Sequence, residues 1–221
     1  MKKDSFIAAI VVIVVSFLLL PVHSFAGGAV KPLEKAEKPV WQVGDTWVYE
    51  VSRTGELQDK KFKATMTVIE ITDKGYAVAV DYGGEKTIEY YNKNINFVRA
   101  TDEKGGMVET CAPEIPVFKW PLEPGKWWKG EYLYQDNKTS GSGSVSMTTE
   151  VIGPETLING EGQEIATLKL VSKRANRYGT FVGKRDLWYD PQTRFIIKRV
   201  DERSLGKREE RSLISFTPGT K

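Results

Sequence analysis

The residue types that carry most catalytic chemistry are nearly absent from this chain. Its 221 residues include one histidine, His23, and one cysteine, Cys111. His23 lies in a signal segment that we expect to be removed, so the remaining chain would have no imidazole for a catalytic triad or a metal site. A lone thiol cannot close an intrachain disulfide, so Cys111 is either a small buried side chain or the site of an intermolecular disulfide. The sequence predicts neither a metal nor a cofactor.

Three short segments match catalytic or nucleotide-binding motifs without their context. The glycines in residues 179–184 stand one residue too close for a phosphate-binding loop, and Arg185 follows where that motif has Ser or Thr. Residues 204–207 match the Ser-x-x-Lys of penicillin-binding enzymes, but the companion motifs are missing or out of order. The glycine-rich stretch 141–144 precedes an expected strand instead of a helix. We interpret all three matches as coincidental.

Carboxylates are the remaining route to acid–base catalysis. A glycosidase needs two of them about 5–10 Å apart, and a sequence does not show such a pair. The carboxylates in or next to expected strands are more simply outward polar positions of those strands. They are Asp45, Glu50, Asp81, Glu89 and Asp186. We therefore predict that the protein is not an enzyme.

Aromatic side chains are abundant and could serve binding. The chain has six Trp and nine Tyr, and core packing accounts for most of them because aromatic residues favour strands. Trp127 and Trp128 are adjacent, so in an extended strand they point to opposite faces and at most one enters a given core. The other, beside Lys126, either lines a groove for a sugar or lipid or caps the end of a barrel. Lys126, Trp127 and Trp128 are therefore candidate ligand-binding residues.

Positive charge gathers in the last third of the chain. Residues 169–211 carry 13 basic and 6 acidic side chains, whereas residues 27–168 carry 16 and 22. Without the signal segment the net charge is +2, which argues against a general polyanion binder. The basic segment is either a set of solvated strand faces or a surface for an anionic ligand such as a lipid head group. Arg185 and Arg199 are the candidate binding residues of such a surface.

Residues 1–26 have the pattern of a cleaved signal peptide. Two lysines precede a run of 15 uncharged residues from Phe6 to Leu20, and Ser24 and Ala26 place small side chains at the two positions that determine cleavage. The run is shorter than the roughly 20 apolar residues of a membrane-spanning helix, although an uncleaved anchor is the alternative. We expect export to the periplasm or the exterior of a bacterial cell, no transmembrane segment after cleavage, and no contact with nucleic acid.

Alternation of apolar and polar residues predicts β-strands along most of the chain from Trp41. The clearest case is residues 62–68, where four apolar side chains fall on one face of a strand, as they could not in a helix. The pattern shifts by one at Ile69, which predicts either a bulge or a strand end that is covered on both faces. Similar runs separated by turn residues such as Asn159-Gly160 predict about nine or ten short strands.

The chain is expected to form a flexible leader at residues 27–40 and a single β domain at residues 41–221. A Pro-rich connector near residues 112–124 interrupts the strands because proline has no amide hydrogen for a sheet. Each part beside this connector would hold only four or five strands, so one core that spans both is favoured. Residues 41–47 and 120–128 both place Gly three residues before a Trp, which leaves open whether the two halves are related.

Four short motifs are distributed over most of residues 41–200. They are Trp41-x-Val-Gly-Asp-x-Trp-x-Tyr49, Pro121-Leu-x-x-Gly-Lys-x-Trp128, Val151-Ile-Gly-x-Glu155 and Trp188-Tyr-x-Pro191. Together they resemble the pattern of an uncharacterised family of exported bacterial β-proteins. The resemblance implies an architecture similar to the open half-barrels that carry lipoproteins or lipids across the periplasm. Because the motifs are structural, it assigns no functional residue.

These observations predict a mostly β protein with little helix, folded as a single antiparallel β-sandwich or open half-barrel. The expected function is non-catalytic binding or carriage of a lipid or another apolar or anionic ligand of the cell envelope. An apolar concave face could hold an acyl chain, and the basic last third could meet its head group or a protein partner. The alternatives are a structural or protein-docking module of the envelope, and then a carbohydrate-binding module.

Overall fold

A computed structural model describes residues 30–55, 59–159 and 161–220 of the chain. Twelve β-strands and one short 3₁₀ helix, η1 (Ser204–Gly206), make up its regular structure. The first six strands are β1 (Thr46–Thr54), β2 (Lys60–Ile71), β3 (Gly75–Tyr82), β4 (Glu85–Asn92), β5 (Phe97–Thr101) and β6 (Met107–Ala112). The last six are β7 (Trp127–Asp136), β8 (Gly141–Ile158), β9 (Glu164–Asn176), β10 (Phe181–Asp190), β11 (Phe195–Arg203) and β12 (Arg208–Thr217).

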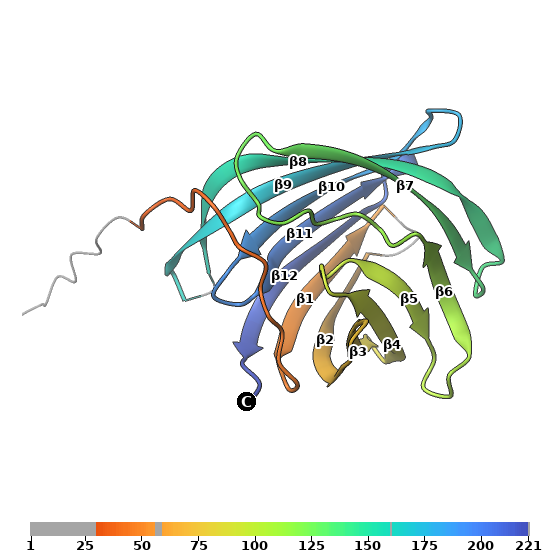
Figure 1. The fold of residues 1–221 in the computed structure, drawn as a ribbon, viewed down its shortest axis with the longest axis horizontal. Helices are drawn as coiled ribbons and strands as arrows, with labels where there is room; N and C mark the ends of the chain where they lie inside the picture. Colours follow the sequence, from red (N-terminus) through yellow and green to blue (C-terminus); the bar gives the residue numbers. More distant parts are fainter. Residues whose placement is uncertain (1–29, 56–58, 160, 221) are drawn as a thin grey trace, which may run out of the picture.

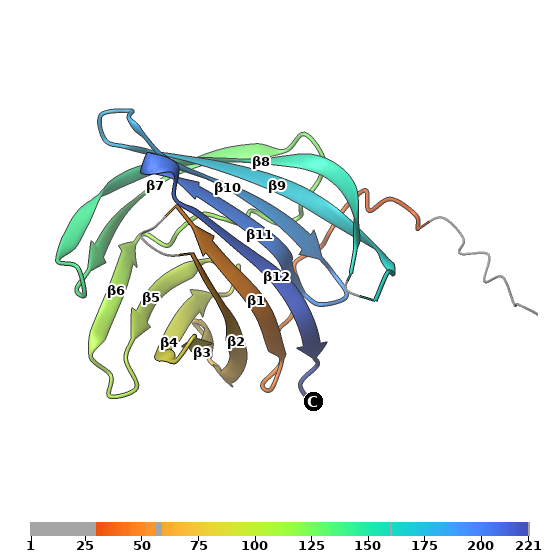
Figure 2. The same cartoon turned by 180° about the vertical axis from the view of Figure 1, so that it is seen from behind.

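The strands form one closed antiparallel barrel in which each strand pairs with its neighbours in the sequence. Figures 1 and 2 show the long strands β8 to β12 and β1 as one strongly curved wall, with the shorter β3 to β6 opposite. The barrel closes where β12 pairs with β1, from Thr46 opposite Thr217 to Thr54 opposite Arg208. On its other side β1 pairs with β2, so no strand of this sheet has a free edge.

The prediction of a sandwich or open half-barrel with nine or ten strands is wrong, although the antiparallel, almost helix-free character is confirmed. The difference arises at strands that carry charged side chains at inward positions. The residues along such strands do not alternate between apolar and polar. In β12, the run Arg208-Glu-Glu-Arg211 has no apolar face, yet Glu209 and Arg211 lie at inward positions beside Arg53 and Val51 of β1. Periodicity alone therefore missed the strand that closes the barrel.

Strand β2 follows the sequence prediction closely. Ala64, Met66 and Val68 are buried on the inner face, opposite Tyr49 and Trp47 of β1. The register with β3 shifts between Val68 and Glu70, so the slip in the hydrophobic pattern is a β-bulge. Ile69, which lies in this bulge, is 45% exposed.

The two ends of the barrel differ in composition. One end, which we call the aromatic end, holds the turns that follow the even-numbered strands, residues 30–45 and the connector 113–126. Its aromatic side chains pack at ring-centroid distances of 5.1 Å for Trp41 with Phe195 and 5.2 Å for Phe118 with Trp120. The opposite end, which we call the arginine end, holds the turns that follow the odd-numbered strands. Figure 1 shows the connector, in green, crossing the barrel between β6 and β7.

Hydrogen bonds attach the connector to the aromatic end. Asn96, in the turn between β4 and β5, donates from Nδ2 to the Phe118 carbonyl at 3.0 Å and accepts from the Phe118 amide at 2.8 Å. The indole of Trp120 donates to the Asn94 carbonyl, and that of Trp128 donates to the Pro116 carbonyl. These bonds satisfy the backbone groups of Phe118, the carbonyl of Pro116 and the indole of Trp120 in a proline-rich segment outside the sheet.

A buried carboxylate, Asp45, connects three distant segments at the aromatic end. Both of its oxygens accept hydrogen bonds from Arg194 Nη1 at 2.9 Å, and they also accept from the backbone amides of Gln42 and Gly219. The Asp45 side chain is fully buried, whereas that of Arg194 keeps 27% of its exposure. The start of β1, the turn between β10 and β11, and the tail after β12 are therefore held together beside the closing strand pair.

We expect Asp45→Asn to lower the free energy of unfolding by about 3 kcal/mol, because breaking a buried ion pair leaves a charge without its partner. Urea denaturation followed by tryptophan fluorescence measures this change. The control is Glu50→Gln, which removes an exposed carboxylate on β1, the strand that follows Asp45, and should change stability by less than about 0.5 kcal/mol. Equal stability of both variants would show that Asp45 does not hold the closure.

Candidate functional site

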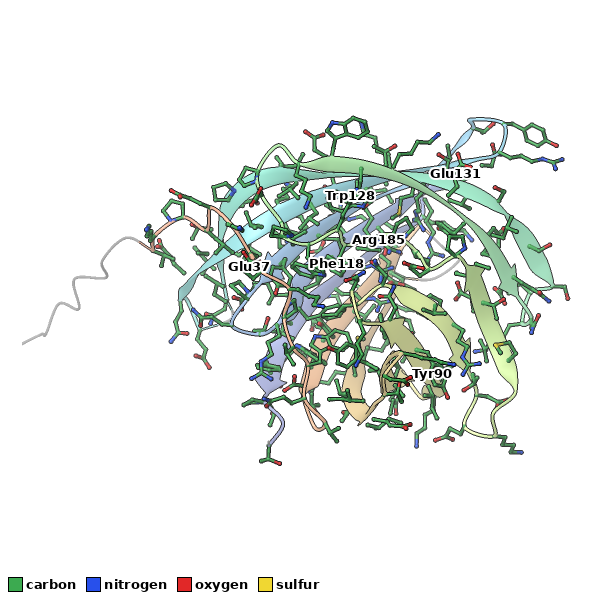
Figure 3. All side chains as sticks on the ribbon, viewed as in Figure 1. Glu37, Tyr90, Phe118, Trp128, Glu131 and Arg185 are labelled. Carbon is green, nitrogen blue, oxygen red and sulfur yellow. The ribbon has the colours of Figure 1, made fainter. Side chains whose placement is uncertain are left out.

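The barrel encloses a cavity of about 1410 Å³ that reaches from the floor formed at the aromatic end to the turns of the arginine end. This volume exceeds the roughly 300–1,000 Å³ of most small-molecule pockets. Residues from opposite sides of the barrel and from the connector line this cavity. Its lining changes from apolar at the floor to charged at the mouth. Figure 3 shows the labelled side chains of Phe118 and Arg185 within the space that the strands enclose.

The floor of the cavity is apolar. Met66 of β2, Ile95 of the turn between β4 and β5, and Phe118 of the connector contribute side chains that are at most 5% exposed. Phe195 and Ile196 of β11 add to the same surface. Since these residues offer almost no hydrogen-bonding groups, the floor suits a hydrocarbon chain or another apolar group.

One wall of the cavity is rich in arginine. The side chains come from inward positions of four consecutive strands, β9 to β12. The lining arginines on these strands are Arg174, Arg185, Arg199, Arg203 and Arg211. We call this set the arginine wall.

Two buried carboxylates pair with this wall. Asp201 is fully buried; it accepts from Arg185 Nε at 2.6 Å and from Arg199, and it lies 3.7 Å from Arg174 Nη2. Burial by itself would raise the pKa of Asp201, but Arg199 and Arg185 hold it well below its ordinary value. Burial and the like charge of Arg185 lower the pKa of Arg199 to about 10.

The second carboxylate is Glu209, whose side chain is 6% exposed. It accepts from Arg53 Nε at 2.9 Å and from Arg211 Nε at 2.8 Å. Burial would raise the pKa of Glu209, but the charges of Arg211 and Arg199 lower it from 4.5 to about 2. Both carboxylates are therefore ionised at neutral pH. Asp201 connects β9, β10 and β11, and Glu209 connects β12 to β1.

The opposite side of the cavity carries acidic groups. Glu89 of β4, Glu109 of β6 and Asp136 of β7 line it, and Glu89 accepts a hydrogen bond from the Tyr91 hydroxyl. Burial raises the pKa of Glu109, and the charges of Glu89 and Asp136 raise it further. We call these three residues the carboxylate wall.

The structure separates the five ligand-binding candidates that the sequence singled out. Trp127 is 66% exposed on the outer face of β7, whereas Trp128 is 5% exposed and belongs to the core. Lys126 donates from Nζ to the Pro121 carbonyl at 2.7 Å and so supports the connector. Arg185 and Arg199 lie together on the arginine wall, inside the barrel and not on an outward surface.

Sequence reasoning missed Arg174, Arg203, Arg211, Glu89 and Glu109 as cavity residues. The sequence signal for these residues is weak. They lie at alternate, inward positions of their strands, but the outward positions of the same strands also carry charges. The strand register shows which charged residues share the inner face, because Arg185 lies opposite Asp201 and Gly183 lies opposite Arg203. Within the described ranges, no group of three His, Cys, Asp or Glu side chains is placed to hold a metal ion.

Comparisons with known proteins give only distant likenesses. No family model matches the chain, and no curated protein matches it. Among solved structures, the hypothetical lipoprotein YmcC from Escherichia coli is 11% identical with a TM-score of 0.48, covering 82% of this chain and 90% of that one. A protein from Bacteroides fragilis, described provisionally as exported and YmcC-like in fold, is 13% identical with a TM-score of 0.48, covering 82% and 99%.

A third structure, described provisionally as a lipoprotein from Parabacteroides distasonis, is 12% identical with a TM-score of 0.45, covering 82% of this chain and 99% of that one. All three descriptions name a lipoprotein or an exported protein. The signal segment that the sequence predicts at residues 1–26 of this chain lies outside the described residues. Identities and TM-scores this low do not assign a family or a function.

We expect the barrel to lose stability in acid. The folded-state pKa of Glu209, about 2, lies below its ordinary value of 4.5, and that of Asp201 is also lowered. Their stabilising effect is therefore complete above the unfolded pKa and lost as pH falls from about 4.5 toward about 2. Urea denaturation at several pH values checks this, and Glu209→Gln should flatten the dependence. Constant stability down to pH 3 would contradict the assignment.

Cys111 is buried among Tyr132, Val145 and Met147. Burial, with the nearby charge of Glu109, raises the pKa of its thiol from 9 to about 12. An intermolecular disulfide is therefore not favoured. In the native protein at pH 8, Ellman's reagent should label Cys111 at least about a hundredfold more slowly than in the urea-unfolded chain, since thiolate is the reactive form. Rapid labelling without denaturant would show that the thiol is accessible.

Proposed function

We propose that this chain is an exported, non-catalytic binding protein that carries a lipid or another apolar or amphipathic ligand inside its barrel. The single observation that carries this proposal is the cavity of about 1410 Å³ with an apolar floor and a charged mouth. The apolar floor of this cavity is costly to leave uncovered, because its residues lose packing contacts that an apolar ligand group would supply. Carriage in a cavity requires neither a metal nor a cofactor.

The competing functions have less support. A structural or docking module would favour a tightly packed interior, and this barrel contains a large space instead. A carbohydrate platform would favour an exposed Trp beside a coplanar ring. Trp127 is exposed, but the stacked ring pairs among the described residues are Trp47 with Phe216 and Phe118 with Trp120.

The cellular setting belongs to the same proposal. Residues 1–26 predict export to the periplasm or the exterior of a bacterial cell, where a carrier would meet envelope lipids or an envelope protein partner and would not meet nucleic acid. Within the described part of the chain, no helix is both long and apolar enough to cross a membrane.

The test is uptake of a fluorescent fatty-acid analogue by the purified protein. Met66→Gln places an amide on the cavity floor and should weaken uptake by about tenfold, because the amide loses water without gaining a partner. The control is Ile69→Gln, which makes the same kind of change on the same strand at an exposed position. It should bind the analogue as the unmodified protein does.

Folding of both variants is verified by their thermal unfolding. If the unmodified protein takes up no analogue, or if folded Met66→Gln and Ile69→Gln bind it equally well, the cavity is not the binding site and the proposal is wrong.

A further inference from the structure

The arginine wall carries more positive charge than its own ion pairs neutralise. Four arginines of this wall, together with Arg53 of β1, contact the two buried carboxylates: Arg174, Arg185 and Arg199 surround Asp201, and Arg53 and Arg211 flank Glu209. These two ion-pair clusters therefore retain three unbalanced positive charges. Arg203 adds another at the mouth, without a carboxylate within 4.0 Å among the residues that the structure describes.

Several donors of this wall are unused. Arg174 Nε is buried and has no hydrogen-bond partner in the described part of the chain. Arg185 contacts Asp201 through Nε, and a guanidinium has four further N–H groups on its two Nη atoms. Arg174 Nε itself is out of reach of solvent, so the donors that these cavity-lining arginines offer to an acceptor from outside the protein are their Nη groups.

The carboxylate wall determines where such an acceptor would lie. Glu109 is close enough to Arg185 and Arg203 for their charges to lower its pKa against the stronger effect of burial, yet it forms no ion pair with either within 4.0 Å. A gap therefore separates walls of opposite charge. An anion in this gap is attracted to Arg174, Arg185 and Arg203 and repelled from Glu109.

We propose that the barrel binds an amphiphile whose phosphate-type anionic head group contacts Arg174, Arg185 and Arg203, while its apolar chain extends to the floor at Met66 and Phe118. This inference rests on the proposed function and adds the chemical class and the orientation of the ligand. Phosphate suits the site because guanidinium groups bind its oxygens with charge-assisted, often bidentate, hydrogen bonds.

The test compares ligands that share one chain and differ in the head group. Dodecyl phosphate, 1-dodecanol and dodecyltrimethylammonium are titrated into the purified protein below their micelle concentrations, and calorimetry measures the dissociation constants. Dodecyl phosphate should bind at least about tenfold more tightly than dodecanol. Its advantage should shrink in high salt, and the ammonium compound should bind most weakly. Inorganic phosphate alone should bind far more weakly than dodecyl phosphate, because it has no chain for the floor.

The double variant Arg174→Gln/Arg203→Gln tests the residues. It leaves Arg185 and Arg199 on Asp201, and it should reduce the preference for phosphate over alcohol to about threefold or less. The matched control is Lys173→Gln/Lys207→Gln, which removes two exposed positive charges next to the same strand ends. The control should keep the full preference. If the double variant does not fold, Arg203→Gln alone, at an exposed position, serves as the test.

The outcomes separate the inference from the proposed function. Equal binding of dodecyl phosphate and dodecanol overturns the head-group assignment and leaves carriage in the cavity intact. A phosphate preference that survives in folded Arg174→Gln/Arg203→Gln overturns the assignment to this wall. Failure of all dodecyl ligands to bind overturns both proposals, and a preference lost only in the double variant supports the inference.

Discussion

The pairing of β12 with β1 is the constraint on which the rest of the structure depends. It closes the sheet, and closure gives every strand an inner face that must be filled, paired or solvated. At the aromatic end, rings and the connector fill that space, and Asp45 holds the closing strands to Arg194. At the arginine end the space stays open as a cavity, and the inward charges of β12 and β11 are buried beside it. Glu209 and Asp201 can be there only because arginines from neighbouring strands surround them.

Two physical requirements thus meet in one cavity. The apolar floor loses favourable contacts when it is empty, and the arginine wall keeps positive charge that its own carboxylates do not balance. The amphiphile that we propose would satisfy both at once, with its chain on the floor and its anionic head group at the wall. The carboxylate wall determines the orientation of a ligand, since it repels the anionic group that the arginine wall attracts.

The sequence predicted those parts of the fold whose pattern is apolar on one face, such as β2 with its bulge after Val68. It failed at β12, where Glu209 and Arg211 point inward and remove the alternation that marks a strand. The site shows the same limit. Arg185 and Arg199 were recognisable as basic candidates, but only the register opposite Asp201 and Leu187 places them inside the barrel. Which charges face one another across a cavity depends on closure and tilt, and periodicity within one strand contains no information about either.

The most direct measurement is native mass spectrometry, with organic extraction, of protein purified from a bacterial periplasm without detergent. Our account predicts a monomer that carries one amphiphile per chain, with an anionic head group in the extract. An empty monomer that also takes up no phosphate-bearing amphiphile on incubation would contradict it.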